Sequence, residues 1–149
     1  MSVGDFCTRN VIVAGPDESI AAATHLMRQH HVGDVIVARE QEGHRFPLGV
    51  VTDRDLVVEI LDAGIDPETV RLSDLITEPL LSARAEEGLA DAVRRMRARG
   101  VRRMPVVDDD GALVGILSMD DVIELLAEEM QDLSALVARE RSQEARRRT

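Results

Sequence analysis

The stretch GVVTDRD at residues 49–55 returns as GILSMDD at residues 115–121. Each copy holds a glycine, two aliphatic residues, a hydroxyl residue, two variable positions and an aspartate. Each is followed by an apolar, acidic stretch with helical spacing, LVVEIL at 56–61 and VIELL at 122–126. A repeat at a fixed spacing indicates that one structural unit is built more than once. The sequence therefore predicts two similar units in one chain.

The repeat extends well beyond this motif. Residues 8–37 align without a gap with residues 77–106, which lie 69 positions later, whereas Gly49 aligns with Gly115, only 66 positions later. The first copy therefore contains three extra residues, and they fall in the polar stretch between Arg39 and Pro47. Because surface loops tolerate insertions, we predict a loop from Arg39 to Pro47.

The pattern of apolar residues predicts a β-α-β-β-α unit from each copy, and hence an α+β protein. In the first copy we expect strands at 11–13, 35–37 and 48–51 and helices at 20–30 and 52–63. In the second copy we expect strands at 80–81, 104–107 and 113–117 and helices at 89–99 and from Asp120 onward. The turn at 108–111 ends in Asp-Gly, which is a strong hairpin signal.

A connector joins the two copies. Asp66 and Pro67 resemble a helix start, because proline is tolerated at the first helical position, and this helix is expected to run to Leu75. The resulting division is a first unit at residues 1–65, a connector at 66–76, a second unit at 77–130, and a C-terminal helical extension with a basic tail at 131–149.

The last helix keeps an apolar stripe beyond the end of the repeat. A stripe that outruns its own unit needs something to cover it. The cover can come from the same chain or from a second chain, and we expect the second, in a homodimer. The arginines of the tail are interpreted as a frayed helix end. The stripe consists of Val122, Leu125, Leu126, Met130, Leu133, Leu136 and Val137.

Composition excludes several classes of protein. A net charge of −10 argues against nucleic acid as the main partner. Neither a signal-peptide pattern nor an apolar run of membrane-spanning length occurs, and the single cysteine, Cys7, cannot form an internal disulfide. These features predict a cytoplasmic protein with no membrane association. All 18 basic residues are arginine, so a basic contact to phosphate must come from arginine or histidine.

The repeated motif has two interpretations that do not exclude each other. Thr52 and Asp55, like Ser118 and Asp121, have the spacing of a capping box, in which a hydroxyl and a carboxylate satisfy the first N–H groups of a helix. A helix start after a glycine-containing strand is also a place where a ligand meets backbone N–H groups. There an aspartate can accept hydrogen bonds from the two hydroxyls of a ribose.

With these motifs, and with VRRMPVVD at 101–108 and the Cys7-Thr8 and Ile76-Thr77 pairs, the chain resembles a tandem pair of cystathionine-β-synthase (CBS) domains, also called a Bateman module. The resemblance covers roughly residues 3–129. It implies two units packed through their sheets about a pseudo-twofold axis, with two related clefts that bind adenosine-containing ligands such as AMP, ADP, ATP, NAD or S-adenosylmethionine.

In such a module the hydroxyl residue and the aspartate of the motif hold the ribose, and the opposite unit completes each cleft. The resemblance therefore implies that one cleft is formed by Thr52, Asp55, Thr77, Leu80, Val101, Arg102 and Arg103, with Arg54 nearby. It implies that the other is formed by Ser118, Asp121, Thr8, Val11, Val32, Gly33 and Asp34.

The two implied clefts differ in charge. Arg102, Arg103 and Arg54 are available to a phosphate in the first, whereas the second has Gly33, Asp34 and Asp120 at the matching positions. A carboxylate near a phosphate is repulsive. We therefore expect the Asp55 cleft to take the more highly charged nucleotide, and the other to bind more weakly or to prefer an uncharged adenosine group.

Nothing in the sequence indicates catalysis. It holds no nucleophile–base pair, no glycine-rich phosphate loop and no metal-ligand set, and His25, His30, His31 and His44 do not form a metal cluster. The predicted function is a non-catalytic sensor that needs no cofactor, binds an adenosyl effector and acts on an unknown regulated protein. The alternative is an interaction scaffold whose clefts are vestigial.

Overall fold

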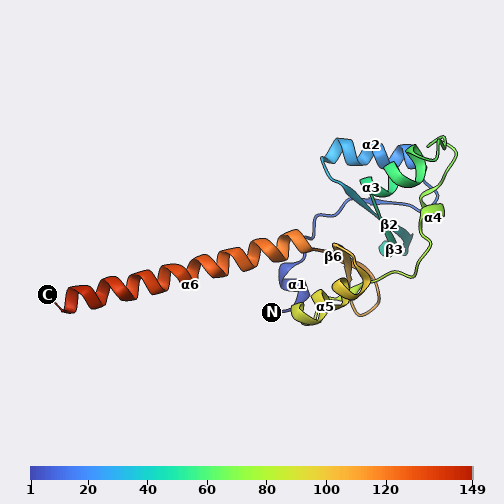
Figure 1. Ribbon diagram of the computed structural model, residues 1–149. Helices are drawn as coiled ribbons and strands as arrows, with labels where there is room; N and C mark the ends of the chain where they lie inside the picture. The colour runs from blue at the N-terminus through green and yellow to red at the C-terminus, as the bar shows by residue number, and fades with distance from the viewer. Residues whose placement is uncertain (149) are drawn as a thin grey trace.

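The computed structural model of the protein describes residues 1–148 and contains two three-stranded sheets (Figure 1). One sheet has the order β1-β2-β3 and the other β4-β5-β6. In both, the first pair of strands is parallel and the second antiparallel. The predicted α+β class and the β-α-β-β-α order of each unit are confirmed.

The first unit is built from β1 (Val13–Ala14), α2 (Ile20–His30), β2 (Asp34–Gln41), β3 (His44–Thr52), α3 (Asp53–Asp55) and the π-helix η1 (Leu56–Leu61). Ser19 caps α2 by accepting a hydrogen bond from the N–H of Ala22, and His31 ends it in the left-handed conformation. The predicted helix from Thr52 thus forms as a short α-helix continued by a π-helix.

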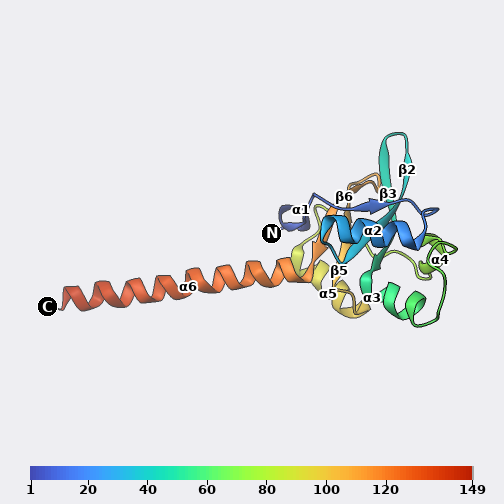
Figure 2. The same ribbon diagram turned by 90° about the horizontal axis from the view of Figure 1, so that it is seen from above.

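The predicted loop from Arg39 to Pro47 is wrong. Glu42 and Gly43, with φ of 52° and 78°, form a two-residue turn, and the strands on either side pair up to Gln41 and His44. Such a turn matches the twist of a hairpin, so the ladder continues to its tip. The stretch is polar because the hairpin projects beyond the body of the molecule, with its tip in solvent (Figure 2).

The second unit repeats the arrangement with β4 (Ala83–Arg84), α5 (Leu89–Arg99), β5 (Arg103–Val107), β6 (Leu113–Ser118) and α6 (Met119–Arg147). The predicted turn at 108–111 is confirmed: Gly111 has a φ of 84°, and the Asp108 carboxylate accepts hydrogen bonds from the N–H groups of Asp110 and Ala112. Gly100 ends α5 in the left-handed conformation, as expected of a glycine after a helix.

Three predicted boundaries need correction. The first strands lie later than expected, at Val13–Ala14 and Ala83–Arg84, because pairing with the central strand and not apolar content sets their position. The connector is helical only in α4 (Leu72–Leu75). Asp66 instead accepts a hydrogen bond from the N–H of Glu68, and such a local turn competes with helix formation.

The segment that precedes each copy packs into the core of the other copy. Val3, in α1 (Val3–Phe6), and Leu72 are repeat equivalents, and both have no exposed surface. Val3 lies in the core of the second unit and donates its N–H to the carbonyl of Glu87, whereas Leu72 lies in the core of the first unit and donates to Glu18. The two units are therefore interlocked, and the residue limits given above for them remain a prediction.

The sheets meet through a third, smaller apolar cluster. Ile36 and Ala38 of β2 and Ile116 of β6 are buried there, with four partly buried residues around them: Val11, Val13, Val50 and Leu113. Thr8 and Ile116 exchange two backbone hydrogen bonds of 2.9 Å, which attach the N-terminal segment to β6. This junction positions the chain segments that line the two clefts.

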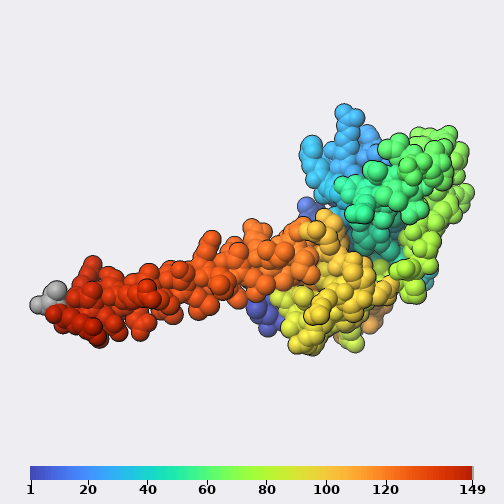
Figure 3. All heavy atoms as spheres, viewed as in Figure 1, coloured from blue at the N-terminus to red at the C-terminus, as the bar shows by residue number. Residues whose placement is uncertain are grey.

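Helix α6 leaves this body and projects into solvent over most of its length (Figures 1 and 3). Only its first turns pack on the second unit, through the buried Val122 and the partly buried Leu125. Within residues 1–148, no helix has the length and apolar character required to cross a membrane.

Candidate functional site: two clefts between the repeats

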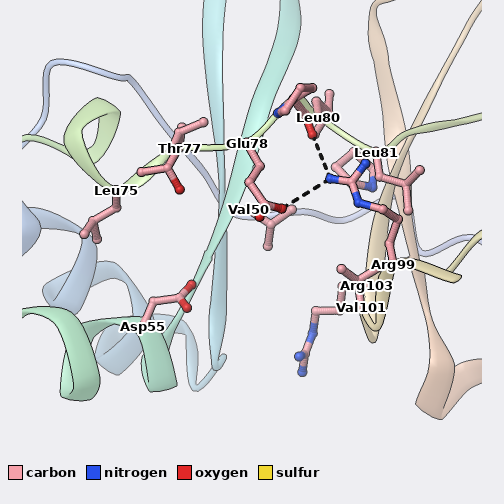
Figure 4. A pocket seen from close by; sticks show the side chains of 14 residues that line it. Val50, Asp55, Leu75, Thr77, Glu78, Leu80, Leu81, Arg99, Val101 and Arg103 are labelled. Carbon is pink, nitrogen blue, oxygen red and sulfur yellow. Dashed lines mark hydrogen bonds and ion pairs between the residues drawn. The ribbon is translucent and has the colours of Figure 1, made fainter. Parts of the chain in front are cut away.

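The first cleft, called the Asp55 cleft, has a volume of about 290 Å³ and lies between the two units (Figure 4). Asp55 and Thr77 lie on one side, and Arg99 and Arg103 lie on the other. Its lining is Gly49, Val50, Asp55, Leu75, Ile76, Thr77, Glu78, Pro79, Leu80, Leu81, Arg99, Val101, Arg103 and Pro105. Five residues expected there are thus brought together: Asp55, Thr77, Leu80, Val101 and Arg103.

The capping interpretation holds in the first copy. The N–H of Thr52 donates to Oδ2 of Asp55 at 2.9 Å, and the N–H of Asp55 donates to Oγ1 of Thr52 at 3.2 Å. The box uses Oδ2, so Oδ1 of Asp55 has no part in it. Capping fixes the orientation of the Asp55 carboxylate at the edge of the cleft, which means that the structural and ligand-binding interpretations are compatible.

Arg99 is a residue of this cleft that the sequence analysis missed. Its guanidinium donates to Glu78 at 3.4 Å and to the carbonyl oxygen of Pro79 at 3.2 Å, and these bonds hold it against the cleft wall (Figure 4). The alignment of the two copies could have indicated Arg99, because it occupies the position that His30 has in the first copy, next to the loop that leads to the cleft.

The second cleft, called the Asp121 cleft, has a volume of about 210 Å³. Thr8 donates its hydroxyl to Oδ2 of Asp121 at 3.2 Å, while Oγ of Ser118 accepts from the N–H of Asp120. The reciprocal capping box of the first copy is therefore replaced by a hydrogen bond that Asp121 accepts from Thr8. The lining is Thr8, Asn10, Val11, Ile12, Val32, Asp34, Ile36, Arg103, Ile116, Ser118 and Asp121.

Arg103 lines both clefts. Its Nε lies 2.9 Å from Oδ1 of Asp34, and the two side chains are only 30% and 19% exposed. Asp34 and Arg103 occupy equivalent positions of the repeat, so their ion pair lies near the pseudo-twofold axis that relates the two units. The expected difference in charge between the two clefts is therefore smaller than predicted. The guanidinium of Arg103, which was expected in the first cleft alone, also lies beside the Asp34 carboxylate in the second.

Four expected site residues line neither cleft: Thr52, Arg54, Arg102 and Gly33. Arg102 donates to Asp120 at 2.8 Å in a pair that is exposed on both sides, which turns its guanidinium toward the helix start. Gly33 lies against Asp53, whose N–H donates to the carbonyl of Gly33.

Burial raises the pKa of the Asp34 carboxyl above its ordinary value; the guanidinium of Arg103 opposes this, and the carboxylate of Asp53 adds to it. Folding therefore favours the protonated form. The stability that Asp34 contributes is present below the ordinary aspartate pKa of about 3.9 and is lost as the pH rises through the raised value.

We therefore expect Asp34→Asn, which cannot ionise, to gain stability relative to the parent protein as the pH rises from about 3 to about 7. Urea unfolding of both proteins over this pH range measures the difference between their free energies of unfolding. The contributions of the other carboxyl groups are common to both proteins and cancel in this difference. A difference that moves the other way would mean that Arg103 outweighs burial and lowers the Asp34 pKa.

The remaining titratable residues do not extend the site. Burial raises the pKa of the Cys7 thiol, which disfavours the reactive thiolate. Among residues 1–148, no three histidine, cysteine or acidic side chains are grouped closely enough to hold a metal ion.

Two β-α-β-β-α units that complete each other's clefts define a tandem repeat module. The chain belongs to the CBS domain family, whose model matches residues 3–62 and 72–128. It is 33% identical over 121 residues to the CBS domain-containing protein YhcV of Bacillus subtilis, which covers 81% of this chain and 82% of that protein. It is 34% identical over 125 residues to the uncharacterized protein MK0525 of Methanopyrus kandleri, covering 84% of this chain but 62% of that longer protein.

Solved structures share the fold. Hypoxic Response Protein I, solved with two coordinated zinc ions, has a TM-score of 0.72 at 28% identity and covers 83% of this chain and 98% of its own. The CBS domain pair of MJ0100, in complex with 5-methylthioadenosine and S-adenosyl-L-methionine, has a TM-score of 0.74 at 21% identity, with coverage of 87% and 98%. PAE2072 of Pyrobaculum aerophilum, complexed with AMP, has a TM-score of 0.72 at 19% identity, with coverage of 81% and 89%.

Proposed function

We propose that the protein is a non-catalytic sensor that binds adenosine-containing ligands in its two clefts. The observation that carries this proposal is that the lining of each cleft combines a motif aspartate from one copy with a threonine from the other, Asp55 with Thr77 and Asp121 with Thr8. An aspartate fixed at a helix start can accept hydrogen bonds from both hydroxyls of a ribose. The apolar residues of each lining give an adenine ring a surface to lie on.

The charges of the two linings support a difference in ligand preference. The Asp55 cleft has two arginines, Arg99 and Arg103, and arginine's planar fork suits phosphate. Both arginines are already ion-paired, Arg99 with Glu78 and Arg103 with Asp34, so the comparison depends on the charge of the whole lining. Two arginines accompany Asp55 and Glu78 in the Asp55 cleft, whereas Arg103 accompanies Asp34 and Asp121 in the other. The proposed ligand of the Asp55 cleft is therefore a nucleotide with one or more phosphates, and that of the Asp121 cleft is a less negatively charged adenosyl compound.

Structural relatives in complex with AMP, or with methylthioadenosine and S-adenosylmethionine, make this ligand class the first to test. In our proposal the protein does not transform the ligand. Ligand binding in a cleft changes the contact between the two interlocked units, and a partner protein binds differently to the altered form. We propose that the working form is a homodimer.

Unfolding in the presence of AMP, ATP, NAD and S-adenosylmethionine tests the proposal. A ligand at 100 times its dissociation constant should add about 2.7 kcal/mol to the free energy of unfolding, and isothermal titration then gives the number of sites. Adenine alone and inorganic phosphate serve as controls for each half of the nucleotide. If no compound in the panel stabilises the protein, the scaffold with vestigial clefts is the better description.

A further inference from the structure

The exposed face of α6 carries a regular apolar seam. Its five residues follow one another at spacings of three, four, three and four positions, which is the heptad pattern of a two-helix coiled coil. They remain between 47% and 68% exposed, because the body contacts only the first turns of the helix (Figure 3). We call this set the α6 seam: Ile123, Leu126, Met130, Leu133 and Val137.

The α6 seam is long enough to pair with another helix. From Ile123 to Val137 it spans roughly 21 Å along the helix axis, at about 1.5 Å per residue. Leu136, 62% exposed, lies beside it and widens the apolar strip. Monomeric proteins seldom leave a continuous apolar strip of this kind in water.

Charge along α6 is divided between its two halves. Residues 119–131 hold five carboxylates and no basic side chain, whereas residues 139–147 hold four arginines and two glutamates. Two copies aligned in parallel would place acidic half against acidic half. Two copies aligned in opposite directions would place the acidic half of each beside the basic half of the other, which is favourable.

We propose that the α6 seam binds the same seam of a second copy as an antiparallel coiled coil. In the register that overlaps the two helices almost from end to end, Leu126 packs against Val137 of the partner subunit and Met130 packs against Leu133 of the partner subunit. The bodies then lie at opposite ends of the helix pair, and neither hinders the other.

The end of the seam also favours this direction. The heptad positions that follow Val137 are occupied by Glu140 and Glu144. In a parallel pair each of these glutamates would face its own equivalent within the seam, where like charges are costly. In the antiparallel register Glu140 lies beside Ile123 of the partner subunit, where its carboxylate can reach solvent.

Disulfide trapping tests the direction of pairing. Leu126→Cys and Val137→Cys are made separately in a Cys7→Ser background. Each variant alone, and a mixture of the two variants, is then treated with oxidised glutathione. We expect a covalent dimer from the mixture and none from either variant alone. A covalent dimer from Leu126→Cys alone would mean parallel pairing and would overturn the proposal.

Light scattering after size exclusion tests whether the seam forms the dimer. Leu133→Glu should make the protein monomeric at tens of micromolar, whereas Ala135→Glu, a matched change on the opposite face of the same exposed segment, should leave the dimer intact. Both sites lie outside the body, so folding of the two units is not at risk. A monomeric parent protein, or a dimer that survives Leu133→Glu, would contradict the proposal, whatever the outcome of the ligand panel.

Discussion

Replacing Gly115 with alanine is expected to reduce the free energy of unfolding by about 3 kcal/mol, at the upper end of the range for overpacking. A Cβ atom at this position would lie 2.5 Å from the carbonyl oxygen of Thr8 and 3.0 Å from Sγ of Cys7. The oxygen cannot move aside easily, because it accepts the N–H of Ile116 while the N–H of Thr8 donates back to the Ile116 carbonyl. The junction of the N-terminal segment with β6 must therefore open.

The repeat supplies a matched control for this substitution. At Gly49, the equivalent position, the three atoms nearest to an added Cβ would all belong to the side chain of Ile76, at 3.0–3.2 Å. A side chain can give way by a few tenths of an ångström more easily than a hydrogen-bonded backbone, so Gly49→Ala should cost less, about 1 kcal/mol. Urea unfolding of both variants measures the difference. Equal losses would mean that the close approach of Thr8 to β6 is not what requires glycine at position 115.

Replacing Asp55 with alanine is expected to weaken AMP binding by about 10- to 100-fold, the loss of one or two hydrogen bonds to a charged acceptor. The prediction rests on the position of the Asp55 carboxylate at the edge of the cleft that also holds Arg99 and Arg103. Titration calorimetry with AMP measures it, and Asp121→Ala should affect this affinity less.

Loss of the cap at Asp55 has to be separated from loss of a ligand contact. Asp74 provides the comparison, because its Oδ2 accepts from the N–H of Arg71 in another helix cap and it lines neither cleft. Asp74→Ala should lower stability by a similar amount, about 1 kcal/mol, with AMP affinity unchanged. If Asp55→Ala binds AMP as the parent does, the assignment of the charged nucleotide to this cleft is wrong.

Several features of the site follow from the repeat alone. Aligning the two copies indicates the two helix starts at Thr52 and Ser118, and with the family resemblance it indicates which segments of the opposite copy face them. Local chemistry also predicts the turn at 108–111, because Asp-Gly needs no distant partner to bend. By contrast, the hairpin around Glu42 and Gly43 was predicted as a loop, because polar composition hides a strand whose two faces are both in solvent.

What the sequence by itself determined is the duplication, the order of elements in each unit and the helix start that carries each motif aspartate, since these depend on periodicity and on residues close together in the chain. Only the tertiary structure decided which charges meet. Asp34 and Arg103 are repeat equivalents 69 residues apart, and the packing of the two sheets places them 2.9 Å from each other. That contact brings one guanidinium into both clefts, while Arg102 pairs with Asp120 outside them. No local pattern encodes it, because it arises where two units fold onto each other.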